Sequence, residues 1–494
     1  MNVVFYIMDC LRTDHCGVFG YSRDTTPVLD RLAREGAAFS SCYAQSGWTA
    51  PSAATMFSSQ HPSRTGIHKM RDALNPEMPW LPEILRANGY TTVGISSMYQ
   101  VSKLRGFDRG FDDFFDLFMD EATMERCRAR GQDARGDHYC LPLSEDLHLK
   151  ALEWLDCREN EYDPFFMMVW SIDTHEPFRQ PDSYNTDAEP GYSGPVDGRG
   201  RPFSRVRNGG DLRHLVDLYD GSLRYQDEKL GEFVKALEER GILDETLIVI
   251  VGDHGEMFFE HGLAGHGKFP WEEELRVPLV MRCPQALQGG VASDALVQMI
   301  DVPATILDLA GLAPEPGFKG RSLRPLLEGS AEPLHETVVL EVPFPFAREE
   351  FARVVRKGDL KYVEYHPPKL GRRVKKIIKE KGRMLTLLAR PGMAGILYGH
   401  HFRKGLGGLL KAALIEPWAY LFGVPTRRLY DLAADPGERR DLVGARGDDA
   451  RRLRDVLAAL DAQAAAVGTA KVSNSAEDEK RIEEHLRQLG YVED

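Results

Sequence analysis

Two apolar segments that each end in an acidic residue constrain the fold of this chain more than any other feature. Residues 2–8 read NVVFYIM and precede Asp9, and residues 246–252 read TLIVIVG and precede Asp253. An unbroken apolar run of this length is typical of a strand that is buried on both faces, as in a parallel sheet covered by helices. The two segments therefore predict central strands of an α/β fold.

Further strand-like and helix-like segments alternate over about the first 330 residues. Residues 90–97 and 163–175 predict two more strands, and residues 215–241 carry the apolar periodicity of one long amphipathic helix. Strands that alternate with helices form sheets with mostly parallel neighbours and with helices on both faces. We therefore predict a central mixed, mainly parallel sheet flanked by helices.

Length and changes in composition divide the chain into parts. Its 494 residues exceed what one hydrophobic core usually organises. The Pro-rich segment at residues 312–318 marks the exit from the sheet, and the shorter alternating segments after it predict antiparallel strands. We predict a large first domain over 1–335, a smaller C-terminal α+β subdomain over 336–470, and a charged helix and tail over 471–494.

Composition and charge exclude several classes of protein. The net charge of −13 argues against nucleic-acid binding. No apolar run reaches the roughly 18–20 residues of a membrane-spanning helix. The chain begins with a strand pattern rather than a secretory signal, and its seven cysteines are scattered without a CxxC pair. We therefore expect reduced thiols and a cytoplasmic location.

A basic segment at about residues 366–425 interrupts the predicted subdomain. Residues 366–411 contain twelve Lys or Arg residues and one acid, Glu380, interleaved with apolar and aromatic residues. Segments of this kind bind an anionic membrane surface or a large acidic substrate. They also pack on the edge of a domain or form oligomer contacts. The sequence leaves these alternatives open, including a peripheral position at the inner membrane face, and it leaves the oligomeric state open.

Several predicted strand ends carry residues that are able to hold a metal ion. Asp9, the pair Asp253–His254, and His175 each close a different predicted strand. In open α/β sheets, ligands bind beyond the carboxyl ends of the strands. Carboxylate oxygens together with an imidazole make a site for a divalent cation. Each residue taken singly could instead be a helix cap or a turn residue, but their joint occurrence favours a metal site.

Several longer motifs occur together and in a fixed order. They run from residue 2 to about residue 442 and read NVVFYIMDCLRTDHCGVFGY, SGWTAPSAATMFSSQHPSRTGIH, THEP, VGDHGE, GHGKFPWEEELRVPL, DVPATILDLAGL and LYDLAADPGERRDL. On these motifs the chain resembles the sulfatase family of the alkaline phosphatase superfamily. The resemblance implies an alkaline-phosphatase-like fold, a first domain of the sulfatase catalytic type, and hydrolysis of sulfate esters.

The resemblance also implies a set of metal ligands. Asp9, Asp253 and His254 would hold one divalent cation, and Thr49 would contact it from the nucleophile position. Cys10 replaces the second metal carboxylate of the family, and we expect its small side chain to lie nearby without binding. We expect Ca²⁺ as the cation, with Mn²⁺ and Zn²⁺ as alternatives.

The remaining implied roles concern the substrate. The segment TAPSA matches the family's Cys/Ser-x-Pro-Ser-Arg motif, so Thr49 takes the nucleophile position and Ser52 joins the substrate-binding residues. His175 would contact the ester or protonate the leaving group. Lys268 would bind the anionic oxygens, with His266 beside it as a further substrate contact.

The identity of Thr49 leaves its role and the activity open. Thr49 is either the nucleophile or an N-cap or first-turn hydroxyl without a covalent role, at the start of a helix that we expect from Pro51 onward. The free N–H groups of that helix attract an anion. Sulfatases of the family convert the Cys or Ser of this motif into the aldehyde residue formylglycine. A threonine cannot mature into formylglycine, so we expect no formylglycine in this chain. The first hypothesis is metal-dependent hydrolysis of a carbohydrate- or lipid-linked sulfate ester through Thr49.

Two alternatives remain beside that hypothesis. One is a phosphodiesterase or a phosphoglycerol- or phosphoethanolamine-type transferase that forms a phospho-Thr49 intermediate. The other is a non-catalytic anion-binding protein that keeps the metal pocket. Ala53 stands where the family motif has an arginine, and this loss, together with that of the carboxylate at Cys10, favours the two alternatives.

Overall fold

The structure is a computed structural model of the whole chain. The insertion predicted at 366–425 lies outside the described residues except for His366, and Lys268 lies outside them as well. The structure describes residues 1–67, 69–70, 72–132, 141–267, 270–343, 351–366, 426–461 and 475–489.

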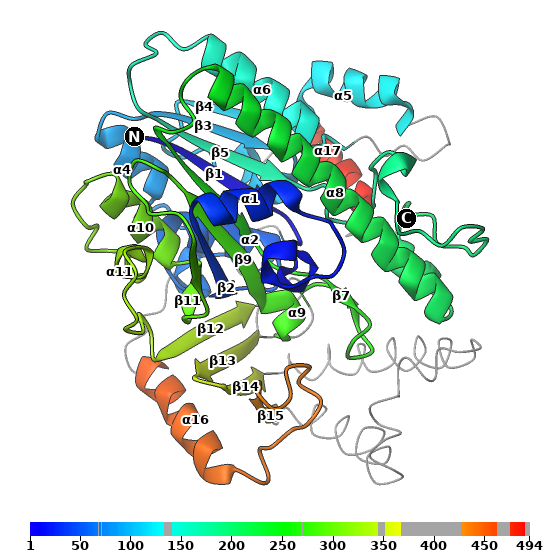
Figure 1. Cartoon of the computed structure of the whole chain (residues 1–494), viewed down its shortest axis with the longest axis vertical. Coiled ribbons are helices and arrows are strands. Elements are labelled where there is room, and N and C mark those ends of the chain that lie inside the picture. Colours follow the sequence, from blue (N-terminus) through cyan, green and yellow to red (C-terminus); the bar gives the residue numbers. More distant parts are fainter. Residues whose placement is uncertain are drawn as a thin grey trace.

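A nine-stranded sheet forms the centre of the molecule (Figure 1). Its middle strand is β1 (Asn2–Met8), which pairs in parallel with β5 (Phe165–Ser171) on one side and with β6 (Thr246–Gly252) on the other. Beyond β5 the sheet continues in parallel through β3 (Thr91–Ser96) and β4 (Asp113–Asp116). The predicted strands therefore form the middle of the sheet.

The other half of the sheet makes it mixed. Strand β9 (Arg276–Arg282) runs antiparallel to both β6 and β2 (Ala37–Tyr43). The short strands β10 (Val291–Ser293) and β11 (Val297–Gln298) pair with β2 in parallel at the edge. The prediction of a central mixed, mainly parallel sheet is confirmed.

Helices cover both faces because alternate side chains of the central strand enter two different cores. The side chains of Val4, Tyr6 and Met8 pack in one core with helices α1 (Pro27–Glu35), α6 (Ser144–Asp156) and α8 (Gly209–Glu239). The side chains of Val3, Phe5 and Ile7 pack in the other core with α2 (Thr49–Ser58), α4 (Leu81–Ala87) and α10 (Asp301–Leu309). A strand that is apolar on both faces is explained by this double burial.

One predicted strand is shorter than its apolar pattern. Strand β5 ends at Ser171, so His175 lies in the loop beyond the strand instead of closing it. The carboxylate of Asp173 accepts hydrogen bonds from the hydroxyls of Ser171 and Ser144 and from the backbone N–H of Ser144. Short polar side chains that bond locally in this way compete with strand pairing, which explains the early end.

A second, smaller sheet is antiparallel throughout, as predicted. Its strands are β12 (Thr337–Pro343), β13 (Phe351–Lys357), β14 (Leu360–His366) and β15 (Thr426–Asp431), paired in that order. Helix α16 (Gly447–Asp461) packs on one face of this sheet. The other face packs on residues of the large domain that include Tyr43 and Trp271. The boundaries placed at residues 335 and 470 stay a prediction.

The predicted C-terminal helix is α17 (Ala476–Gln488), which packs through Ile482 and Leu486 on Tyr99 and Phe118 of the large domain. Among the described helices, none combines the length and the apolarity that crossing a bilayer requires. The remaining short α-helices and strands among the described residues are α3 (Pro62–Thr65), α5 (Glu121–Cys127), α7 (Pro202–Arg205), α9 (Glu272–Leu275), α11 (Arg324–Leu327), β7 (Met257–Phe258) and β8 (Ala264–Gly265).

Candidate active site

The candidate site forms where the three central strands end at the same level. Met8 pairs with Ser171 on one side and with Gly252 on the other, so the residues that follow these strands emerge side by side. Asp9 and Asp253 are therefore neighbours although they are far apart in the chain. The N-terminus of α2 faces the same edge of the sheet, as the contacts of Thr49 demonstrate.

Thr49 is the first residue of helix α2, and its hydroxyl points at the strand ends. Its Oγ1 donates a hydrogen bond of 3.4 Å to Oδ2 of Asp9 and lies 3.3 Å from Nε2 of His254. The N-cap of α2 is Trp48, and no side-chain capping bond is made there. The interpretation of Thr49 as the helix cap is therefore wrong, because its hydroxyl contacts Asp9 and His254 and not the helix amides. A first-turn hydroxyl without a covalent role stays the alternative to a nucleophile.

Two carboxylates are held without exposure to solvent at this edge. Oδ2 of Asp9 accepts a hydrogen bond of 3.1 Å from Nε1 of Trp170. Oδ1 of Asp253 accepts bonds from the backbone N–H groups of Cys10 (3.1 Å) and His254 (2.8 Å), whereas its Oδ2 has no hydrogen-bond partner among the described residues. Burial and the nearby charge of Asp9 raise the pKa of Asp253 well above its ordinary value.

His254 is held in one orientation and stays neutral. Burial and the neighbouring His266 lower the pKa of His254 to about 4, so the imidazole carries no charge at neutral pH. Its Nδ1 lies 2.9 Å from the carbonyl oxygen of Gly255, which leaves Nε2 facing Oδ2 of Asp253 at 3.3 Å. A metal-binding histidine is commonly oriented by such a bond from its other ring nitrogen.

These residues fit a divalent cation. Asp9, Asp253 and His254 are fully buried, and their donor atoms lie within 4.8 Å of one another. Two buried carboxylates beside a neutral imidazole leave negative charge without compensation, which is costly in a protein interior. A divalent cation between these donors would supply that compensation. The fit supports the ligand set expected from the sequence, in which Thr49 adds a hydroxyl oxygen.

Two further predicted histidines lie in the same cluster. The ring of His266 lies 4.6 Å from the ring of His254 and 5.0 Å from that of His175, measured between centroids. Nδ1 of His266 lies 3.2 Å from a carboxylate oxygen of Glu256. His175 is 1% exposed, and its Nδ1 contacts the carbonyl oxygen of Glu176. The site thus gathers three imidazoles around Asp9 and Cys10.

Ser52 lies next to the cluster but bonds to the backbone. Its Oγ donates a hydrogen bond of 2.6 Å to the carbonyl oxygen of Asp253 and so ties α2 to the end of β6. Its expected contact with substrate stays a prediction, as does the role of Lys268, which lies outside the described residues. Ala53 is fully buried in the core, at the position of the motif's arginine.

Three residues of the site were not predicted. Trp170 orients Asp9, Glu256 contacts His266, and the Tyr219 hydroxyl donates a bond of 2.8 Å to the carbonyl oxygen of Cys10. Glu256 could have been found in the sequence, because it lies two residues after His254 in the motif VGDHGE. Trp170 and Tyr219 sit on regular elements and carry no local signal that separates them from core residues.

The loop after Asp9 is braced by ion pairs. Arg12 donates to both carboxylate oxygens of Asp14, at 2.9 and 2.7 Å, and to the carbonyl oxygen of Glu256. Nδ1 of His15 lies 2.7 Å from Oδ1 of Asp220 on helix α8. These hydrogen bonds and ion pairs hold the loop in place, and none of them involves a side chain of the candidate metal ligands Asp9, Asp253 and His254.

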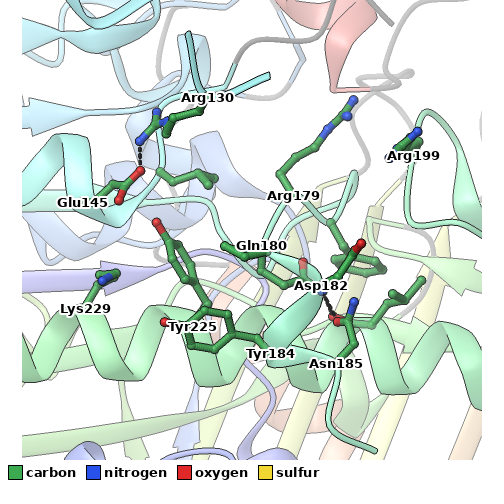
Figure 2. Close-up of a pocket in the computed structure, with 14 residues that line it drawn as sticks. Arg130, Glu145, Arg179, Gln180, Asp182, Tyr184, Asn185, Arg199, Tyr225 and Lys229 are labelled. Atoms are coloured by element: carbon green, nitrogen blue, oxygen red, sulfur yellow. Dashed lines mark hydrogen bonds and ion pairs between the residues drawn. The ribbon is translucent and has the colours of Figure 1, made fainter. Parts of the chain in front are cut away.

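A cavity of about 510 Å³ lies beside the segment that follows His175 (Figure 2). Because Arg179 on its wall is four residues from His175, their Cα atoms are no more than about 14 Å apart. Tyr184 and Tyr225 line the cavity with their ring centroids 5.2 Å apart. Basic side chains outnumber acidic ones in its lining, with Arg130, Arg179, Arg199 and Lys229 against Glu145 and Asp182.

Known proteins resemble the chain in sequence and in fold. An N-acetylglucosamine-6-O-sulfatase of Bacteroides thetaiotaomicron is 25% identical over 416 residues, which are 67% of this chain and 71% of that protein. An arylsulfatase of Clostridium perfringens is 25% identical over 379 residues, or 66% and 78% of the two chains. The phosphonate monoester hydrolase of Agrobacterium radiobacter superposes with a TM-score of 0.70 at 19% identity, covering 96% of this chain and 100% of that chain.

Fold, site and relatives together define an ester hydrolase built on a mixed α/β sheet. The Sulfatase family model matches residues 1–312, and the chain belongs to the sulfatase family. Residues of the described site from Asp9 to His266 all fall within the matched part of the chain.

Proposed function

We propose that the chain hydrolyses sulfate esters with Thr49 as the nucleophile. The position of the Thr49 hydroxyl carries this proposal, since it lies at the N-terminus of a helix and within 3.4 Å of Oδ2 of Asp9 and 3.3 Å of Nε2 of His254. The first N–H groups of a helix have no acceptor within the helix, and together with the helix dipole they favour an anion. A sulfate group placed there meets the Thr49 oxygen.

The residues supply both proton transfers that the reaction needs. Oγ1 of Thr49 forms a bond to sulfur, its proton passes to Oδ2 of Asp9, and the bond between sulfur and the alcohol oxygen breaks. His175 gives a proton to that leaving oxygen. Water then adds to the sulfur of the Thr49 sulfate and gives a proton to His175, Asp9 returns its proton to the Thr49 oxygen, and sulfate leaves with the Thr49 hydroxyl restored. The net reaction converts ester and water into alcohol, sulfate and one proton.

Asp9, Asp253, His254 and the Thr49 oxygen would hold one divalent cation. When bound, such a cation neutralises the sulfate oxygens and lowers the pKa of the threonine hydroxyl. Without it, the buried carboxylates would repel the anionic ester, so turnover is expected to require the metal.

The substrate that we propose is a sulfated carbohydrate. A relative from Bacteroides thetaiotaomicron is a sulfatase of N-acetylglucosamine, which supports a saccharide as the alcohol part. The cavity beside residues 178–182 offers basic groups and the rings of Tyr184 and Tyr225. These groups suit a saccharide unit that carries hydroxyl and anionic groups. A saccharide unit adjacent to the sulfated one would occupy this cavity.

Hydrolysis of a phosphate ester is the second candidate, and the side chain of Thr49 favours it. The hydrated aldehyde of formylglycine carries a second hydroxyl that helps to expel sulfate, and threonine lacks this group. A phosphothreonine intermediate can be hydrolysed by water or pass its phosphoryl group to an acceptor. The fold shared with a phosphonate monoester hydrolase is compatible with attack at sulfur or at phosphorus.

Parallel kinetics on matched substrates test the two candidates. The purified protein with Mn²⁺, Zn²⁺ or Ca²⁺ is assayed on an aryl sulfate, the same aryl phosphate and the aryl phosphodiester, beside Thr49→Val and Thr49→Ser. We expect the sulfate to be hydrolysed, Thr49→Val to be inactive and Thr49→Ser to retain activity. A preference for a phosphate ester would replace the first candidate by the second.

Mass spectrometry of the peptide at residues 45–59 tests the covalent step. Acid quenching during turnover should trap sulfate or phosphate on Thr49, and the accurate mass distinguishes the two groups. Equal activity of Thr49→Val and the parent would refute a nucleophilic Thr49, and a lack of turnover on every substrate would refute both candidates.

A further inference from the structure

Cys10 adopts a backbone conformation that is unfavourable for its residue type. Its φ angle is 60°, in the left-handed region that a side chain other than glycine rarely occupies. Such a conformation is unfavourable and persists only where the surroundings enforce it. Here the Cys10 N–H bonds to Oδ1 of Asp253 at 3.1 Å, and its carbonyl oxygen accepts a bond from Tyr219 at 2.8 Å.

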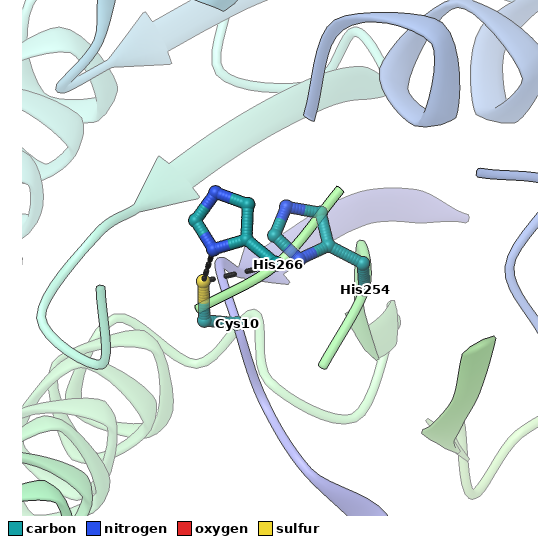
Figure 3. Close-up of side chains that lie close together, drawn as sticks. All are labelled: Cys10, His254 and His266. Carbon is teal, nitrogen blue, oxygen red and sulfur yellow. Dashed lines mark hydrogen bonds between the residues drawn. The ribbon is translucent and has the colours of Figure 1, made fainter. Parts of the chain in front are cut away.

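The strained backbone directs the Cys10 thiol toward the imidazoles of His254 and His266 (Figure 3). Sγ of Cys10 lies 3.2 Å from Oδ1 of Asp9, 3.6 Å from Nδ1 of His266 and 3.9 Å from Nδ1 of His254, and the side chain is fully buried. Two ligands of one tetrahedral zinc ion, a sulfur and a nitrogen, lie about 3.6 Å apart, given Zn–S and Zn–N distances of about 2.3 and 2.0–2.1 Å. The thiol and the imidazole of His266 have this spacing.

The donor set around Cys10 matches a transition metal better than calcium. Calcium takes 6–8 oxygen ligands, whereas thiolate and imidazole ligands select zinc and related ions. Within the described residues, the donor clusters at this edge draw on two carboxylates, three imidazoles and one thiol. Asp9, Asp253 and Thr49 together offer five oxygens at most. The expectation of calcium therefore fits these residues less well than its alternative Zn²⁺.

We propose that the Cys10 thiolate is a ligand of the metal in this site, together with Asp9 and an imidazole nitrogen, and that it makes the site selective for a zinc-class cation over calcium. Binding replaces the thiol proton by the metal and releases that proton to solvent. The proposal rests on the metal site of the proposed function. Its test measures binding and absorption without turnover, so its failure is distinguishable from failure of the proposed activity.

Cobalt(II) is the probe, because a cobalt–thiolate bond absorbs in the near ultraviolet and bonds to oxygen or nitrogen do not. The full-length protein is freed of metal with a chelator, titrated with Co²⁺ and compared with Cys10→Ser, Cys10→Gly and Cys157→Ser. Cys157 is an exposed thiol, so Cys157→Ser controls for stray binding. We expect the absorption band in the parent and in Cys157→Ser and its loss in both Cys10 variants.

Cys10→Gly keeps the test informative if other substitutions hinder folding. Glycine accepts the φ angle of 60° without strain, so this variant should unfold at a higher temperature than the parent when both lack metal. Its zinc affinity should fall by more than about 100-fold, beyond the roughly 10- to 100-fold effect of removing an outer-sphere partner. Calorimetric titration with Zn²⁺ and Ca²⁺ measures both affinities.

The preference between the two ions gives the second readout. The parent should bind Zn²⁺ more tightly than Ca²⁺, and Cys10→Asp should gain Ca²⁺ affinity because it adds carboxylate oxygens. The proposal is overturned if the cobalt-loaded parent lacks the thiolate band, if Cys10→Ser retains it, or if the parent binds no cobalt. It is also overturned if the parent prefers calcium.

Discussion

Nε1 of Trp170 donates a hydrogen bond of 3.1 Å to Oδ2 of Asp9, in the interior of the molecule. The indole comes from β5 and the carboxylate from the end of β1, and both side chains are fully buried. This bond fixes the carboxylate that also accepts the hydroxyl of Thr49. The orientation of the proposed proton acceptor therefore depends on a neighbouring strand.

Trp170→Phe should lower kcat/KM by about 10- to 100-fold, because a hydrogen bond to a charged group contributes about 1.5–3 kcal/mol. Metal affinity should fall as well, since Asp9 loses the group that orients it. Trp154→Phe is the matched control: it removes an indole bond of 2.9 Å to Asp113, away from the site. Steady-state kinetics and metal titration of both variants check the prediction, which fails if the two behave alike.

His175→Gln should slow the hydrolysis of esters with poor leaving groups far more than that of activated aryl esters. A departing alkoxide needs a proton from His175, whereas a nitrophenolate leaves without one. The measurement is the dependence of kcat/KM on the pKa of the leaving alcohol, for parent and variant. An equal loss across the series would show that His175 positions the substrate instead of protonating it.

Arg199→Ala should raise KM for a sulfated oligosaccharide about tenfold and leave KM for a small aryl ester unchanged. Arg199 lines the cavity of Figure 2, is half-buried, and makes no ion pair with any described residue, so its charge is available to an anionic neighbour of the cleaved ester. Arg213→Ala, at an exposed arginine outside the cavity, serves as control. Equal KM values for parent and variant on the oligosaccharide would remove the cavity from the binding site.

Lys361→Met should destabilise the protein by about 3–5 kcal/mol, because it leaves buried carboxylates without their partner. Nζ of Lys361 is fully buried and lies 2.9 Å from Glu272 and 2.8 Å from Glu438, at the contact between the small sheet and the large domain. Lys357→Met removes an exposed lysine from the adjacent strand and should cost less than about 0.5 kcal/mol. Urea unfolding compares the stability of the two variants. A loss of stability in Lys361→Met as small as that in Lys357→Met would contradict a stabilising role for the ion pairs of Lys361.

Stability should decrease as the pH falls below about 6.5, with His148 as one cause. Burial lowers the pKa of folded His148 to about 3. His148 in the unfolded chain therefore binds a proton near pH 6.5, whereas His148 in the folded protein binds it only near pH 3. Each such group removes up to about 1.4 kcal/mol of stability per pH unit within that window.

Unfolding in urea at pH 7.5, 6.5 and 5.5 measures this slope in the parent and in His148→Gln. The glutamine retains a polar group beside the hydroxyl of Tyr6, which lies 2.9 Å from Nε2 of His148, but takes up no proton. The variant should show a flatter dependence on pH between 6.5 and 5.5. Parallel curves for the two proteins would refute the contribution of His148.

Much of the fold could be predicted from local patterns. The runs at 2–8 and 246–252 lie in the centre of the sheet because unbroken apolar strands are stable only when both faces are covered. The antiparallel small sheet followed from alternating apolar residues. Strand β5 ended earlier than its pattern indicated, because Asp173 bonds to nearby hydroxyls and closes the strand.

The candidate site was predictable in its acids and histidines but not in its geometry. Asp9, Asp253 and His254 could be chosen because each follows a predicted strand, and parallel strands bring their carboxyl ends to one edge. The orientation of Thr49 could not be predicted, since a hydroxyl at a helix start is as well suited to capping as to catalysis. Its contact with His254 bridges 205 positions of the chain.

The sequence by itself determined the α/β class, the strands that carry the acids and the residues that gather at their ends, because an unbroken apolar run marks a strand buried on both faces and parallel strands end at one edge. Only the tertiary structure decided that Trp170 orients Asp9 and that Cys10, at a φ of 60°, turns its thiol toward the histidines. Both facts depend on which strands become neighbours and on hydrogen bonds from Asp253 and Tyr219. Local periodicity carries no information about such long-range contacts.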